Sequence, residues 1–376
     1  MLPIFVPLFI DGIFTYLTIL FLPIVVIYNF KHNFKIDVNL KFWIGYIIFS
    51  FISSIYLNSY NEFTIKYLIL YIQGFLVYYI ITSIYNYMDF EWLIKWVVFF
   101  SIISFFIVAV QDFFGLTDVY IVNEGGGHID EYSRLVPKGF DPNYYYLHLL
   151  LPFCFSIVKL RDSKILLHKY FYLFLFLIFA YASIGLSSKS SLIVMIILSL
   201  LIFLKKGKTT IYLIIFTLIV LFFLPILTQL FPYSFMRYET LIDAITSSNY
   251  ESATTSRTVA WYKSFFNFLN NPISGIGIGQ VVEENSKNRM LTYLGLQTTH
   301  NGIIHTLAES GLIGFLLIFI PIFRVLIQSF KMNNDILKYT IIGSLIMIMS
   351  IDAIYYKVLM FNFALVTIFF KKNKYV

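Results

Sequence analysis

The sequence predicts an all-α protein: a polytopic transmembrane helical bundle with about 11–12 spans and one long extracytoplasmic loop. Of its 376 residues, 59% are hydrophobic and 12% are charged, whereas soluble domains have about twice that share of charged residues. The apolar residues form long unbroken runs, unlike the short alternating segments of an outer-membrane barrel. Lysine and arginine gather in alternate connections between these runs, as expected of a multi-span membrane protein.

The composition excludes several other classes of protein. A compact soluble domain has too small an interior to hide this much apolar surface, and a disordered chain would not contain it. The net charge is +7, from 27 Lys and Arg against 20 Asp and Glu. Membrane orientation accounts for this excess, so we expect no nucleic-acid partner. The single cysteine, Cys154, excludes an intrachain disulfide framework and a cysteine-based zinc site.

Apolar stretches with lengths near the roughly 20 residues that cross a hydrocarbon core mark the expected spans. They cover residues 3–28, 42–58, 67–85, 92–111, 143–160, 170–187, 190–204, 211–231, 306–329, 338–355 and 357–370. The first stretch has Asp11-Gly12 at its centre and prolines around it, so it forms either one crossing or two short half-spans. The sequence therefore leaves open on which side the N-terminus lies.

The basic residues predict the orientation of the spans. They cluster at Lys31, Lys35 and Lys41, at Lys159, Arg161, Lys164 and Lys169, at Lys205, Lys206 and Lys208, at Arg324, Lys331 and Lys338, and at Lys371, Lys372 and Lys374. The positive-inside rule places these clusters and the C-terminus in the cytoplasm. We expect a single transmembrane domain over 1–376, with a short extracytoplasmic loop at 112–142 and a long one at 232–305. A loop of the second length is uncommon unless it is functional.

The long loop carries a predicted helix at residues 256–270. Ser256 is a candidate N-cap, and Asn270-Asn271-Pro272 ends the helix. Arg257 then lies in the first turn, where free backbone N–H groups and a guanidinium converge into an anion site. The alternative is an amphipathic helix that lies on the membrane, with Arg257 touching lipid headgroups. The apolar residues at helical spacing are Val259, Tyr262, Phe266 and Leu269.

A glycine-rich segment and a histidine follow this helix. Gly275, Gly277 and Gly279 do not have the spacing of a nucleotide-binding loop, so we interpret them as a turn that lets the backbone approach another segment closely. His300 lies at a loop-to-helix junction on the predicted outer side. A neutral imidazole there can take a proton from a sugar hydroxyl, and the alternative role is to cap the helix.

His305 and Glu309 are four residues apart and share a helix face. His300 is five residues from His305 and faces elsewhere, so the two histidines fit a metal site badly. The spacing favours a buried hydrogen-bonded pair of His305 and Glu309 near the outer end of a span.

These motifs together resemble the O-antigen ligase/polymerase superfamily of bacterial membrane glycosyltransferases. The resemblance includes the stretch from Ser256 through Gly279, the pair His300-Asn301 and the run Glu309-Ser-Gly-Leu-Ile-Gly314. The element Arg134-Leu-Val-Pro-Lys-Gly-Phe-Asp-Pro-Asn143, just before a predicted span, also matches. The likeness covers most of the chain from about residue 130, and the span count and the long outer loop agree with it.

The resemblance implies a metal-independent, cofactor-free glycosyltransferase of the GT-C type. Its donor is a glycan on undecaprenyl pyrophosphate, displayed at the outer leaflet of the bacterial inner membrane. A pyrophosphate leaving group needs cations rather than a protonating acid. The implied roles are a general base for His300, pyrophosphate-binding cations for Arg257, Lys189 and Arg134, and support for Asn301, Glu309 and Asn143. Lys189 stands in Ser188-Lys189-Ser190 where the family has arginine, and lysine lacks the bidentate fork of arginine.

Three functions remain open, and an O-antigen polymerase is favoured because the chain is short and its outer loops are modest. A polymerase moves the growing glycan onto the sugar of a lipid-linked repeat unit, whereas a ligase moves the finished chain onto lipid A–core. A transporter of the lipid-linked glycan is less favoured, since the chain shows no internal repeat. We expect a multi-pass inner-membrane protein with its active site facing the periplasm. Its expected partners are the undecaprenyl-pyrophosphate-linked oligosaccharide, membrane lipid and a chain-length regulator protein.

Overall fold

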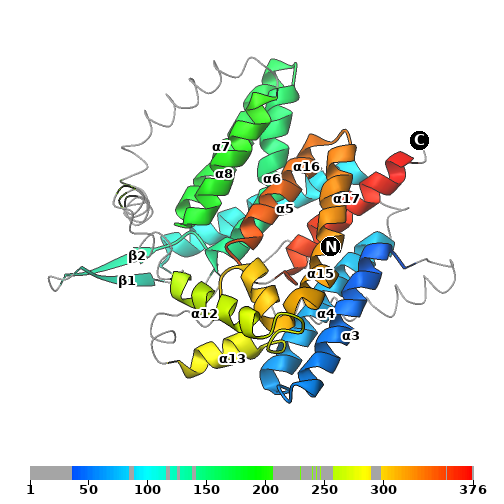
Figure 1. Ribbon diagram of the computed structural model, residues 1–376. Helices are drawn as coiled ribbons and strands as arrows, with labels where there is room; N and C mark the ends of the chain where they lie inside the picture. The colour runs from blue at the N-terminus through cyan, green and yellow to red at the C-terminus, as the bar shows by residue number, and fades with distance from the viewer. Residues whose placement is uncertain are drawn as a thin grey trace. The chain divides into compact units, whose positions relative to one another are not determined.

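The computed structural model describes residues 36–83, 89–115, 119–124, 128–137, 141–205, 257–288, 298–352 and 354–374, together with residues 229, 239, 243 and 246. The predicted all-α fold is confirmed, because helices dominate these residues and a two-stranded sheet is the only addition among them (Figure 1). The contacts between residues divide the chain into two units. Among the described residues, the first unit holds those within 90–249, and the second holds those within 36–89 and 257–374.

The first unit is built around helix α6. Its elements are α5 (Phe90–Phe113), β1 (Val119–Glu124), β2 (His128–Ser133), α6 (Pro142–Asp162), α7 (Leu166–Gly185) and α8 (Lys189–Leu204). Helix α6 packs against α5, α7 and α8. Nearly all of its residues from Pro142 to Val158 are buried. Asp141 caps α6, because its Oδ1 accepts from the Asn143 N–H at 2.7 Å.

Strands β1 and β2 form an antiparallel hairpin in the segment 112–142, which was predicted only as a loop. Val119 lies opposite Ser133 and Glu124 opposite His128. Hydropathy does not mark such short strands. A run of β-branched and aromatic residues before a glycine cluster is the signal that predicts a strand there.

The second unit is built around helix α15. Its elements are α3 (Val38–Tyr56), α4 (Glu62–Ser83), α12 (Arg257–Asn270), α13 (Gln280–Lys287), α15 (Gly302–Lys331), α16 (Asp335–Ile348) and α17 (Lys357–Lys374). Helix α15 contacts α3, α12, α13, α16 and α17. Trp43 lies in the core, stacked on Phe75 with the ring centroids 5.2 Å apart. Its indole N–H donates to the Ile318 carbonyl at 3.3 Å. Trp43 thus joins α3 to α4 by ring stacking and to the central helix by a hydrogen bond.

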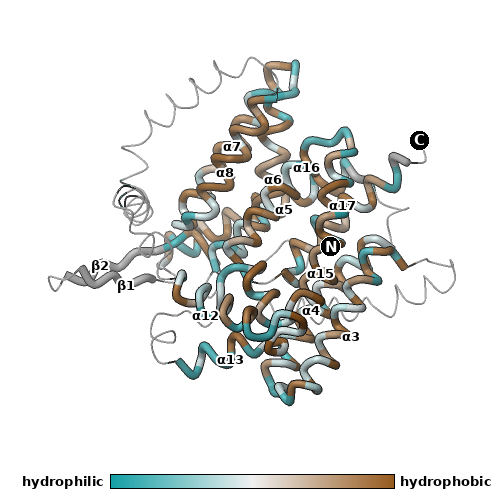
Figure 2. Tube along the Cα trace, in the orientation of Figure 1, coloured by the Kyte–Doolittle hydropathy of each residue, from teal (hydrophilic) through white to brown (hydrophobic). Residues whose placement is uncertain are grey.

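Among the described residues, the helices that are long and apolar enough to cross a membrane are α3, α4, α5, α7 and α15. Helix α8 is apolar but shorter. Figure 2 shows the hydrophobic residues along these helices. Each predicted apolar stretch within the described residues corresponds to a helix, whereas the stretch 3–28 and, apart from residue 229, the stretch 211–231 lie outside them. The chain is therefore a multi-pass helical membrane protein.

Within each unit, the structure joins helix ends that the basic clusters assign to the same side. Lys371 forms an ion pair with Asp37 at 3.0 Å, and Arg324 Nε donates to the Asn39 side chain at 3.1 Å. In the first unit, Arg161 donates to the Ile202 carbonyl at 3.2 Å. Which of the two sides is cytoplasmic stays a prediction.

Candidate active site

His300 occupies the turn just before α15. Its backbone φ is 49°, and its side chain is half-buried. The next residue, Asn301, is the N-cap of α15, since its Oδ1 accepts from the N–H groups of Ile303 and Ile304, both at 3.1 Å. The predicted loop-to-helix junction is confirmed. The alternative of His300 as the helix cap is wrong, because Asn301 fills that role.

Trp261 of α12 is hydrogen-bonded to the same turn. Its indole N–H donates to the carbonyl of Thr299 at 2.7 Å, and the buried Thr299 hydroxyl donates to the Asn301 carbonyl at 3.1 Å. Arg257 begins α12 four residues before Trp261, so the two side chains share a helix face. Arg257 therefore lies one helical turn from the contact that holds the residue beside His300.

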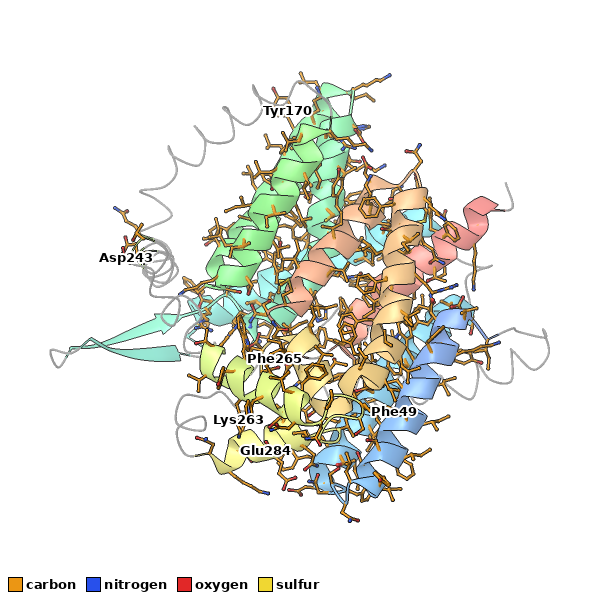
Figure 3. All side chains as sticks on the ribbon, viewed as in Figure 1. Phe49, Tyr170, Asp243, Lys263, Phe265 and Glu284 are labelled. Carbon is orange, nitrogen blue, oxygen red and sulfur yellow. The ribbon has the colours of Figure 1, made fainter. Side chains whose placement is uncertain are left out.

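Helix α12 confirms the helix predicted from residue 256 to residue 270, and it ends at Asn270. Ser256, the candidate cap, lies outside the described residues. The face of α12 that docks on the protein is small and polar, with Ala260 and Ser264 buried. Lys263 donates to the Glu284 carbonyl of α13 at 3.2 Å, and Figure 3 labels both side chains. The opposite face of α12 carries large apolar side chains that are exposed.

Residues 272–277 insert into a break in α15. The break lies at Gly311, whose φ and ψ are 60° and −162°. In a continuous helix, the two N–H groups that follow Gly311 would bond to carbonyls four residues earlier. Here the inserted segment supplies the missing partners on both sides of the break. The Leu312 N–H donates to the Pro272 carbonyl at 2.8 Å, and the Ile313 N–H donates to the Ile273 carbonyl at 3.3 Å. In return, the carbonyls of Ala308 and Glu309 accept from the N–H groups of Ile276 and Gly277, both at 2.9 Å.

Two glycines make this insertion sterically feasible. Gly275 has a φ of 68°, and a Cβ there would meet the backbone of Glu309 and Ser310 closer than 3.0 Å. A Cβ on Gly311 would meet the backbone of Ile273 in the same way. The predicted close backbone approach of the glycine segment is confirmed. The insertion ties α12, which ends at Asn270, to the helix that follows His300.

His305 and Glu309 form the predicted buried pair. The His305 Nε2 lies 3.3 Å from the Glu309 Oε2, and both side chains are almost completely buried. Tyr67 of α4 packs beside the pair, with its ring centroid 6.0 Å from that of His305. Glu309 also accepts the N–H of Gly277 through its carbonyl. It therefore helps to hold the segment of α15 that His300 precedes.

In the first unit, Asn143 joins two motifs that are distant in the sequence. Its Oδ1 accepts from the hydroxyls of Ser188 at 2.6 Å and Ser190 at 2.7 Å. Ser188 is the N-cap of α8, and Lys189 is the first helical residue. Arg134 lies nearby in the same unit: it is buried, and the N–H of the following Leu135 donates to the carbonyl of the last residue of α7 at 2.9 Å.

The structure thus gathers the predicted site residues into two sets, one in each unit. The first set is Arg134, Asn143 and Lys189, and the second is Arg257, His300, Asn301 and Glu309. Sequence reasoning missed the connecting role of Trp261 and Thr299 in one set, and that of the two serines flanking Lys189 in the other. The sequence feature that could have indicated this link is a tryptophan one helical turn after Arg257. Within the described ranges, no three His, Cys, Asp or Glu side chains are grouped so as to hold a metal ion.

Most of these residues lie in a segment that is similar to a known protein family. A family model described as O-antigen ligase matches residues 171–319. The matched segment contains Lys189, Arg257, His300 and Glu309, whereas Arg134 and Asn143 precede it. A search of curated proteins returned no significant match. Residues 171–319 of this chain are therefore similar to the superfamily of O-antigen ligases and polymerases.

Proposed function

We propose that this protein is an O-antigen polymerase. It transfers a glycan from undecaprenyl pyrophosphate to the sugar of a lipid-linked repeat unit at the periplasmic face of the inner membrane. The observation that carries the proposal is the contact between Trp261 and Thr299, which holds the turn of His300 against the helix that begins at Arg257. A base and a cation are the two groups that transfer from a pyrophosphate donor requires.

In the proposed reaction, the His300 imidazole takes the proton of an acceptor sugar hydroxyl. The hydroxyl oxygen forms a bond to the anomeric carbon of the donor, and the bond from that carbon to the pyrophosphate oxygen breaks. The pyrophosphate keeps the electron pair, so negative charge builds on it as the bond breaks. Arg257 stabilises this charge, and the resemblance to the family implies the same role for Lys189 and Arg134. The reaction needs neither a metal nor a cofactor.

The remaining predicted residues act by positioning. Asn301 fixes the first turn of α15 next to His300. Glu309 holds the same helix segment through its carbonyl and through His305. Asn143 holds the serines on either side of Lys189. A base and cations that are held in place in this way stabilise a transition state without further reorganisation.

A ligase is the second candidate, because the family that matches residues 171–319 is described as O-antigen ligase. The modest length of the predicted outer loops favours the polymerase. A ligase acts on lipid A–core, whereas a polymerase acts on another lipid-linked repeat unit and is expected to work with a chain-length regulator. A transporter leaves Arg257 and His300 without a role.

The decisive experiment gives the purified protein one substrate, the undecaprenyl-pyrophosphate repeat unit, and separates the products on a gel. A polymerase produces a ladder that is absent with His300→Ala and present with His168→Ala, a change at an exposed histidine of α7. Transfer only after lipid A–core is added identifies a ligase. No transfer with either acceptor contradicts both transferase assignments. An unchanged ladder from His300→Ala removes His300 from the mechanism.

A further inference from the structure

Helix α12 exposes its apolar face. Tyr262, Phe265, Phe266 and Leu269 are 75%, 46%, 51% and 55% exposed. Their spacing of i, i+3, i+4 and i+7 places them in one stripe along the helix. Soluble proteins usually bury such a stripe, but here the small and polar face makes the contacts with α13 and α15.

The stripe is continuous with the apolar surface of α15. After Leu269, the next large apolar residue is Ile273, which is 66% exposed and bonded through its carbonyl to the N–H of Ile313. On α15, Leu312, Ile313 and Leu316 are also exposed. Helix α15 is long and apolar enough to span a membrane, and a spanning α15 would turn these exposed residues toward lipid.

The apolar surface stops at α13. The sequence of α13 is rich in polar and charged residues, Figure 2 shows hydrophilic residues along much of it, and its two valines are buried. Lys287 on α13 has a side chain that is 71% exposed and is paired with Glu283. The two helices therefore expose surfaces of opposite character, although both pack against α15.

We propose that α12 is an interfacial helix, lying flat in the membrane surface with its apolar stripe among lipid acyl chains. Exposed apolar area is unfavourable in water, and an amphipathic helix removes this cost by burying its apolar face at the boundary between headgroups and acyl chains. Because the stripe of α12 continues into the apolar surface of α15, we infer that both surfaces contact the same environment, which is lipid. The placement does not depend on the transfer reaction.

The placement also sets the depth of the turn that carries His300. The insertion of residues 272–277 into α15 fixes the end of α12 relative to the spanning helix. The bond from Trp261 fixes the beginning of α12 to the turn before α15. Arg257, at the first position of α12, then lies at the level of the lipid phosphates.

Spin labels on single cysteines test the placement in liposomes of phosphatidylcholine and phosphatidylglycerol. Cys154 is buried, and Cys154→Ala removes it as a background. Labels are placed at Phe266→Cys on the stripe, at Leu316→Cys on α15 as the lipid reference and at Lys287→Cys on α13 as the water reference. We expect the Phe266→Cys label to collide with dissolved oxygen as the Leu316→Cys label does, and to be shielded from a water-soluble nickel chelate.

Three other results overturn the proposal. Nickel accessibility at Phe266→Cys equal to that at Lys287→Cys places the stripe in water. Low accessibility to both reagents places it against protein. Dipolar broadening between labels shows that a second copy covers it. Leu269→Cys, on the same stripe, gives an independent reading if Phe266→Cys folds poorly.

Discussion

The indole N–H of Trp261 donates to the carbonyl of Thr299 at 2.7 Å. Thr299 directly precedes His300, and Trp261 follows Arg257 by one helical turn. A single side-chain hydrogen bond therefore links the helix of the proposed pyrophosphate cation to the turn of the proposed base. The contact joins segments that are separated in the sequence by the rest of α12 and by α13.

Replacing Trp261 by Phe keeps an aromatic ring but removes the donor. We expect transfer to fall by about 10- to 100-fold, since a shift of about 1 Å in a catalytic group has an effect of that order. Stability should change by only about 1 kcal/mol, as for one hydrogen bond. Trp92→Phe, at a 58% exposed tryptophan of α5, is the matched control. Equal transfer rates in the two variants would show that the bond does not position the site.

The insertion into α15 can be tested with two glycines of similar backbone conformation. Gly275 has a φ of 68° and a crowded Cβ position, whereas Gly115 has a φ of 65° and nothing within 4 Å. Gly115→Ala should therefore cost only the conformational penalty of about 1–2 kcal/mol. Gly275→Ala should cost about 1–3 kcal/mol more from overpacking. Thermal unfolding of both variants in detergent measures the difference, and similar midpoints would argue against the insertion.

Asn143 is expected to act as a hydrogen-bond acceptor for two serines. Asn143→Ala removes the acceptor from the Ser188 and Ser190 hydroxyls, so it should destabilise the protein by about 1–3 kcal/mol. Asn143→Asp keeps an acceptor oxygen and should be closer to the wild type in thermal stability. Wild-type stability in Asn143→Ala would contradict the hydrogen bonds at 2.6 and 2.7 Å.

Lys189 is expected to contribute charge rather than a particular geometry. Lys189→Arg should retain transfer, and Lys189→Ala should lose it, because a developing pyrophosphate charge requires a cation. Gel analysis of the products with saturating donor measures the effect. Full activity in Lys189→Ala would instead make the lysine an anchor at the membrane surface.

The pair of His305 and Glu309 is expected to be structural. Glu309→Leu leaves a buried histidine without its partner and should destabilise the protein by about 3 kcal/mol. The double variant His305→Phe with Glu309→Leu removes both polar groups and should recover most of the lost stability. Thermal midpoints of the single and double variants give the comparison. A double variant that is stable but inactive would assign the pair a part in the reaction.

Several features of the protein follow from local sequence. The lengths of the apolar runs predict helices, because each span must satisfy its own backbone hydrogen bonds in lipid. The Asn-Asn-Pro sequence predicts the end of α12, and the four-residue spacing predicts the pair of His305 and Glu309. Three glycines predict a close backbone approach. Each of these predictions depends on residues within one or two turns of each other.

Only the tertiary structure showed what those local features contact. The glycine segment meets Gly311 in a broken α15, Trp261 meets Thr299, and Asn143 meets Ser188 and Ser190. It also decided that α12 docks through its polar face, whereas the hydrophobic pattern by itself fits either face. Such pairings join residues far apart in the chain, and their energies depend on shape and on backbone groups that every residue shares. Composition and periodicity therefore determine which helices and local motifs this protein forms, and packing decides which of them are in contact.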